Sequence, residues 1–211
     1  MEILLLRHGE TDWNQQGRCQ GASDLDLNSS GMSQAEEVGR SLRQEPLAGI
    51  YSSPMKRAIQ TAEIIGRHHS DLPILIDGDF RELDHGLLEG LTFDEIKSQY
   101  PGFIGRWREA AAELKVPGGE SLAEVDLRSW NALQRVAERH TAGTALVVTH
   151  NFPILATLCR ITATPLDHYR AFHTVPCALA RIRHSKEQGW ELVQDGQSAS
   201  AAAANLTRVQ F

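Results

Sequence analysis

The feature that most constrains the fold is a pair of short apolar runs, far apart in the chain, that each end in a histidine. Residues 2–6 are nearly all apolar and lead into Arg7 and His8, and residues 144–149 lead into His150. Runs of this kind are typical of strands that are covered on both faces in a parallel sheet. Because ligands bind outside the carboxyl ends of the strands in open α/β sheets, we expect both histidines in one site. The pattern indicates an enzyme.

Strand-like and helix-like segments alternate along the rest of the chain. Further strands are expected at residues 49–52, 74–76, 177–184 and 190–194. Helices are expected at residues 34–42, in a segment whose first turn contains Pro54, and after Asn151. This alternation predicts an α/β protein, a three-layer α/β/α sandwich with a mostly parallel central sheet.

The segment from residue 93 to about 141 has a helical pattern that is broken at Pro101-Gly102 and again at residues 117–119. We expect its first part, about 93–120, to form a helical lid over the carboxyl edge of the sheet, within one domain of residues 1–195. Residues 196–211 are expected to be a C-terminal tail, disordered or forming a short helix.

Composition excludes several classes of function. A formal net charge of −6 argues against nonspecific nucleic-acid binding, and the apolar runs are too short to span a bilayer. The first residues show no basic region or cleavage site, which favours a cytoplasmic protein. Three cysteines that lie far apart are typical of reduced thiols, and they predict neither a disulfide framework nor a zinc site.

Four motifs, in order along residues 3–152, resemble the histidine phosphatase superfamily, the phosphoglycerate-mutase-like proteins. The first is Arg7-His8-Gly9 with Asn14 and residues 17–21, and the last is residues 148–150. Between them lie residues 52–58, which read Ser-Ser-Pro-Met-Lys-Arg-Ala, and residues 81–86, which read Arg-Glu-Leu-Asp-His-Gly. An Arg-His-Gly tripeptide alone would be weak evidence for the family, because it occurs by chance in many chains. Four motifs in the family's order are strong evidence for it.

The resemblance implies that His8 is the nucleophile that becomes phosphohistidine. Its ring must be held in one tautomer, and nearby backbone can supply the hydrogen bond. Arg7 and Arg57 are the expected clamp on the phosphate oxygens, and His150 is expected as a protonated imidazole beside them. Glu82 is the expected general acid and base, because a partly desolvated carboxyl can hold its proton toward neutral pH. Asp84 and Glu89 compete for that role, and Glu82 could instead pair with Arg81.

Five further residues are expected to bind substrate. Asn14 can donate to the phosphate, and a helix that begins at Asn151 can aim backbone N–H groups at it. Gln20 and Gly21 belong to the first motif, and His85 follows the acid closely enough to line the substrate side. His85 and residues 117–122 are similar to metal-independent phosphoserine phosphatases of the superfamily, although the same pattern also occurs in its broad phosphatases.

These features predict a metal-independent phosphomonoesterase that acts on a small phosphorylated metabolite, with no cofactor and L-phosphoserine as one candidate substrate. The alternatives are an α-ribazole phosphatase, a cofactor-dependent phosphoglycerate mutase and, remotely, an inactive phospho-ligand binding module. Ala22 after Gly21 and the short segment before Glu82 depart from the mutase pattern and favour hydrolysis. An apolar edge strand at residues 177–180 leaves a homodimer open.

Overall fold

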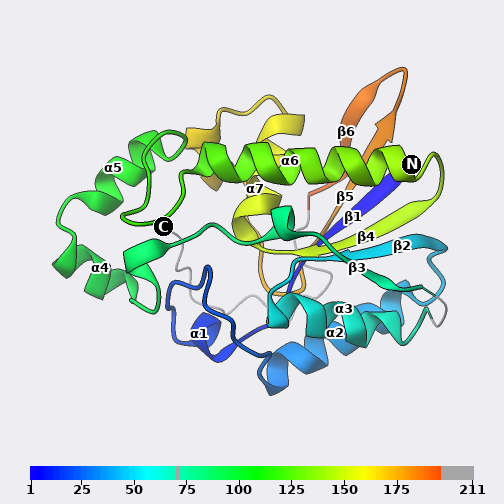
Figure 1. The fold of residues 1–211 in the computed structure, drawn as a ribbon, viewed down its shortest axis with the longest axis horizontal. Coiled ribbons are helices and arrows are strands. Elements are labelled where there is room, and N and C mark those ends of the chain that lie inside the picture. Colours follow the sequence, from blue (N-terminus) through cyan, green and yellow to red (C-terminus); the bar gives the residue numbers. More distant parts are fainter. Residues whose placement is uncertain (70–71, 196–211) are drawn as a thin grey trace.

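The computed structural model describes residues 1–69 and 72–195, and its centre is a sheet of six strands in the order β3-β2-β4-β1-β5-β6 (Figure 1). Strands β1, β2, β3 and β4 run parallel, β5 is antiparallel to β1, and β6 is antiparallel to β5. The mostly parallel sheet is confirmed. The strands are β1 Glu2–Arg7, β2 Leu47–Ser52, β3 Ile74–Ile76, β4 Thr144–Thr149, β5 Leu179–Ser185 and β6 Gly189–Gln194.

Helices cover both faces of the sheet, which makes the predicted three layers (Figure 1). Because side chains alternate along a strand, Leu4 and Leu6 of β1 pack with α2 and α3, whereas Ile3 and Leu5 pack with α6 and α7. Each such buried side chain contributes roughly 1.5–3 kcal/mol to stability. The covering helices are α2 Ser29–Leu42, α3 Lys56–Gly66, α6 Leu122–Arg139 and α7 Asn151–Ile161.

The helical excursion lies beyond the carboxyl ends of β1 and β4, as predicted (Figure 1). It consists of α4 Phe93–Gln99 and α5 Phe103–Ala110, which Pro101 and a left-handed Gly102 (φ 77°) separate. Phe103 and Trp107 are buried in a cluster with Phe152 of α7, so they serve as core rather than as an open ligand surface. Burial of these large rings fixes the excursion to the rest of the domain.

Side-chain caps explain where four of the seven α-helices in the described residues begin. Ser121 and Glu124 form the expected capping box at the start of α6. Pro54 does not lie in the first turn of its helix as predicted, because α3 begins at Lys56 after the N-cap Met55. The polar segment before α2 also contains a short helix, α1 Asp12–Gln15, which the sequence pattern did not indicate.

The expected edge strand at residues 177–180 is wrong. Strand β5 begins at Leu179 and lies between β1 and β6, so its backbone groups are paired on both sides. The edges of the sheet are β3 and β6. Because β5 is paired on both sides, it offers no free edge for a homodimer. The predicted tail at residues 196–211 lies outside the described residues.

Candidate active site

The two histidines predicted from the apolar runs do meet. Strands β1 and β4 are parallel neighbours with Arg7 opposite Thr149, so the residues that follow them leave the sheet at the same edge. The rings of His8 and His150 have centroids 5.1 Å apart.

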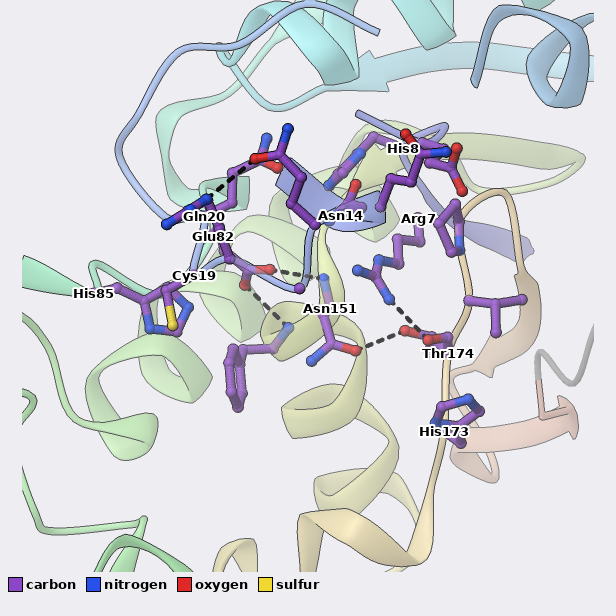
Figure 2. Close-up of a pocket in the computed structure, with 18 of the residues that line it drawn as sticks. Arg7, His8, Asn14, Cys19, Gln20, Glu82, His85, Asn151, His173 and Thr174 are labelled. Atoms are coloured by element: carbon purple, nitrogen blue, oxygen red, sulfur yellow. Dashed lines mark hydrogen bonds between the residues drawn. The ribbon is translucent and has the colours of Figure 1, made fainter. Parts of the chain in front are cut away.

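A cavity of about 390 Å³ opens at this edge (Figure 2). Seven of the ten expected site residues line it, whereas Arg57, His150 and Gly21 are buried next to lining residues. The seven are Arg7, His8, Asn14, Gln20, Glu82, His85 and Asn151.

His8 is held in the tautomer that a nucleophile needs. Its Nδ1–H donates to the carbonyl oxygen of Gly9 at 2.7 Å, as expected, so the lone pair is on Nε2. Burial, and then the charges of Arg57 and Arg7, hold the pKa of His8 well below its ordinary value of 6.5. The ring is therefore neutral near pH 7. Gly9 allows this close turn, because a Cβ there would meet the Gly31 carbonyl oxygen at 2.6 Å.

Arg7 presents unused donors to the cavity. Its Nη1 donates to the carbonyl oxygen of Thr174 at 2.8 Å, whereas its buried Nε has no partner among residues 1–69 and 72–195. Burial lowers the pKa of Arg7, but a guanidinium keeps its charge at neutral pH. A buried donor without a partner is costly, and a bound anion would satisfy it.

Arg57 is fully buried and is already largely engaged, which departs from the expected two-armed clamp. Its Nη1 donates to the carbonyl of Ser23 at 2.7 Å, and its Nη2 donates to that of Gly21 at 2.8 Å. With its amide oxygen facing the guanidinium, Gln20 accepts from Nε at 3.1 Å and donates to the Thr11 hydroxyl. Burial lowers the pKa of Arg57 to about 10, so it still contributes a positive charge beneath the site.

His150 differs from the expected protonated imidazole. Its pKa lies well below 6.5, first because the ring is buried and then because Arg57 and His8 are close, so it is neutral in this structure. The Ser53 hydroxyl has no acceptor among the described residues other than Nε2 of His150 at 2.7 Å, so we assign its proton to that hydrogen bond. The ring proton is then on Nδ1, a buried donor with no described partner.

Glu82 occupies the helix N-terminus that was expected to receive the anion. Its carboxylate accepts from the N–H groups of Asn151 and Phe152, both at 3.0 Å, and from that of Leu83 at 2.9 Å. The predicted contact between these helix N–H groups and phosphate is therefore wrong. Burial raises the pKa of Glu82 above 4.5, against the opposing effect of the hydrogen bonds and arginines.

The competing carboxylates are engaged elsewhere, and Arg81 donates to the carbonyl of Gly78 at 2.8 Å rather than pairing with Glu82. Glu89 accepts from the backbone N–H groups of Gly21, Ala22 and Ser23, so it holds the loop that carries Arg57's acceptors. Asp84 accepts from the N–H of Gly86 within its own turn, and it does not line the cavity.

The remaining expected residues line the cavity in different ways. Asn14 Oδ1 accepts from the N–H of Thr11 in a capping box, which leaves its NH₂ group available to a ligand. His85 packs edge-on against Phe152 with ring centroids 5.7 Å apart, and burial lowers its pKa to about 4.

The segment before β5, which the sequence pattern did not indicate as part of the site, forms one wall of the cavity. Because β5 runs antiparallel to β1, its leading residues arrive at the carboxyl end of β1, and the Cys177 N–H donates to the Arg7 carbonyl at 3.1 Å. The polar pair His173-Thr174 before an apolar strand was the available signal. The lining residues from this segment are His173, Thr174, Val175 and Pro176.

The described part of the chain contains no group of three or more His, Cys, Asp and Glu side chains placed to hold a metal ion. None of its helices is both long and apolar enough to cross a membrane.

Comparisons with known proteins agree with this geometry. Phosphoserine phosphatase 1 of Hydrogenobacter thermophilus is 36% identical over 172 residues, which are 82% of this chain and 81% of that protein. The probable phosphoglycerate mutase GpmB of Salmonella choleraesuis is 31% identical over 214 residues, which cover 100% of this chain and 99% of that protein. The structure of mycobacterial glucosyl-3-phosphoglycerate phosphatase in complex with VO3 matches with a TM-score of 0.84 at 28% identity, over 93% of this chain and 99% of that one.

The family model for the histidine phosphatase superfamily (branch 1) matches residues 3–196. Together with relatives named as phosphatases, this match makes the protein a phosphoric monoester hydrolase. The chain belongs to branch 1 of the histidine phosphatase superfamily.

Proposed function

We propose that the protein hydrolyses a small phosphate monoester through a phosphohistidine at His8, without a metal ion. One observation carries the proposal: a neutral His8 lines the cavity with Arg7 and lies 5.1 Å from the His150 ring, and both Arg7 Nε and His150 Nδ1 are buried donors that lack described partners. Phosphoryl oxygens would satisfy both donors while phosphorus faces the lone pair of His8 Nε2.

In the first step, His8 Nε2 forms a bond to phosphorus as the bond from phosphorus to the ester oxygen breaks. Glu82 gives its proton to the departing oxygen, which leaves as an alcohol. Arg7, the Asn14 amide and His150 Nδ1–H hold the other oxygens, and Arg57 adds charge from beneath.

In the second step, water attacks the phosphohistidine and gives a proton to Glu82. The bond from nitrogen to phosphorus breaks, inorganic phosphate leaves, and both His8 and Glu82 return to their starting protonation states. The cations of the site supply the charge that magnesium supplies in many other phosphoryl-transfer enzymes.

The names of the relatives support a small phosphorylated metabolite as the substrate. L-phosphoserine is one candidate, because a phosphoserine phosphatase is 36% identical and His85 lines the cavity. Transfer back to phosphoglycerate, as in a mutase, is the alternative that GpmB supports. We place the protein in the cytoplasm, where such metabolites occur.

The test is phosphate release, in the presence of excess chelator, from L-phosphoserine, D-phosphoserine, 3-phosphoglycerate, α-ribazole phosphate and p-nitrophenyl phosphate. We expect release that the chelator does not reduce and that is faster with L-phosphoserine than with its mirror image. A large loss of rate that magnesium restores would contradict the metal-free mechanism. Conversion of 3-phosphoglycerate to 2-phosphoglycerate without free phosphate would show a mutase instead.

A further inference from the structure

The Asn151 side chain has a fixed orientation at the edge of the cavity. Its Oδ1 accepts a hydrogen bond of 2.8 Å from the hydroxyl of Thr174, a residue that is only 2% exposed. The backbone carbonyl of the same threonine accepts from Arg7 Nη1 at 2.8 Å (Figure 2). One buried residue therefore holds both a cation of the site and an amide that lines the cavity.

The charges around Asn151 favour the same orientation. Its Oδ1 lies toward Thr174 and the Arg7 guanidinium, where a carbonyl oxygen is stabilised (Figure 2). Its backbone N–H donates to Glu82 Oε2 at 3.0 Å, which places the residue beside the general acid. The Nδ2 donors face away from Arg7, and no residue in the described ranges accepts from them.

We propose that Thr174 is a positioning residue that presents the Asn151 NH₂ group to the leaving group of the substrate. The proposal rests on the proposed function, in which Glu82 protonates the ester oxygen. An amide next to Glu82 then reaches an oxygen close to that ester oxygen, on the leaving group rather than on the phosphate.

This position of the Asn151 amide predicts which class of phosphate ester the protein prefers. A leaving group that carries a hydroxyl or carboxylate oxygen near the ester bond would accept from Asn151, whereas a plain alkyl group would leave the amide unpaired. Sites that offer a polar group to the substrate discriminate strongly against analogues that lack its partner. The protein should therefore prefer oxygen-bearing esters over alkyl esters of the same size.

The test compares 3-phosphoglycerate with propyl phosphate, which has the same number of carbons and no acceptor on them. The variable is the ratio of kcat/KM for the two esters. Thr174→Val removes only the hydroxyl, because the carbonyl that binds Arg7 remains, so we expect this ratio to fall about tenfold. Thr174→Ser should restore it.

The matched control is Thr157→Val. Thr157 is also 2% exposed, and its hydroxyl donates to the carbonyl of Pro153 within α7, away from the cavity lining. This variant should keep the wild-type ratio. A role of Thr174 in stability alone would lower kcat for both esters equally, and that result would overturn the proposal. Asn151→Ala provides a second variant in case Thr174→Val does not fold, and it should show the same fall in the ratio.

Failure of the two proposals can be told apart. If the wild type hydrolyses neither ester nor p-nitrophenyl phosphate, the proposed function is wrong. Calorimetric titration with 3-phosphoglycerate and with inorganic phosphate then tests the positioning role by itself. Thr174→Val should weaken binding of 3-phosphoglycerate more than that of inorganic phosphate, by about tenfold. Equal weakening, or none, would overturn the inference.

Discussion

At the scale of single residues, burial shifts the pKa values of the nucleophile and of the general acid in opposite directions. It lowers the pKa of His8, whose charged form is a cation, and it raises the pKa of Glu82, whose charged form is an anion. Both groups are thereby moved toward their neutral forms, which are the forms that attack phosphorus and protonate a leaving oxygen. Burial in one pocket thus favours the neutral, nucleophilic form of His8 and the protonated, acidic form of Glu82.

These shifts predict a bell-shaped dependence of kcat/KM on pH with phenyl phosphate. Protonation removes the lone pair of His8, so the rate falls as pH drops through a pKa below 6.5. Ionisation removes the proton of Glu82, so the rate falls as pH rises through a pKa above 4.5. A profile that rises steadily into the alkaline range would contradict the role of Glu82 as the acid.

Glu82→Gln distinguishes the part of the pH profile that is due to ionisation of Glu82 from the part that is due to ionisation of the substrate. The phosphate of the ester itself ionises at a pH of about 6, and a limb due to that ionisation should persist in the variant. The limb that belongs to Glu82 should disappear, with a fall in kcat/KM on the order of 10²–10⁴.

At the scale of elements, helix α6 holds the loop that carries the acid. Arg128 donates to the backbone carbonyls of Asp79, Arg81 and Glu82 at 2.8, 2.6 and 2.8 Å. Its guanidinium also pairs with Glu120 through Nη2 at 2.8 Å, and the side chain is only 11% exposed. Arg128 therefore fixes the position of the backbone that carries the Glu82 side chain.

Arg128→Met should loosen that loop. Loss of a largely buried ion pair is expected to lower the free energy of unfolding by about 3 kcal/mol. The displaced acid should reduce kcat/KM by about tenfold to a hundredfold. Urea unfolding and p-nitrophenyl phosphate hydrolysis measure the two effects.

Arg135→Met is the matched control on the same helix. Arg135 pairs with Asp77 and Asp79, but its side chain is 49% exposed, so its removal should cost no more than about 1 kcal/mol. Equal losses of stability and activity in the two variants would show that Arg128 has no special role at the acid loop.

The elements were largely predictable from the sequence because periodicity and caps are local signals. The runs before His8 and His150 gave β1 and β4, and the Ser121-Glu124 spacing gave the start of α6. The antiparallel direction of β5 depends on pairing with β1, which is not local, so the wall at Thr174 was missed. The neutral His150 and the anchoring of Arg57 depend on depth and neighbours that appear only after folding.

At the scale of the whole molecule, the positive site contrasts with the rest of the chain. The formal net charge is −6, yet the buried Arg57 and the half-buried Arg7 both lie at one edge of the sheet. Buried cations lose solvation unless an anion approaches, so the fold gathers charge where a phosphate is expected to bind. The parallel strands β1 and β4 bring His8 to the same place.

The most direct test of this account is to trap the enzyme during turnover of p-nitrophenyl phosphate by a rapid quench into alkali, and to locate the bound phosphoryl group by mass spectrometry. We expect a phosphohistidine at His8 in the wild type, and neither phosphoenzyme nor hydrolysis in His8→Ala. A phosphoryl group on another side chain, or sustained hydrolysis by His8→Ala, would contradict the account.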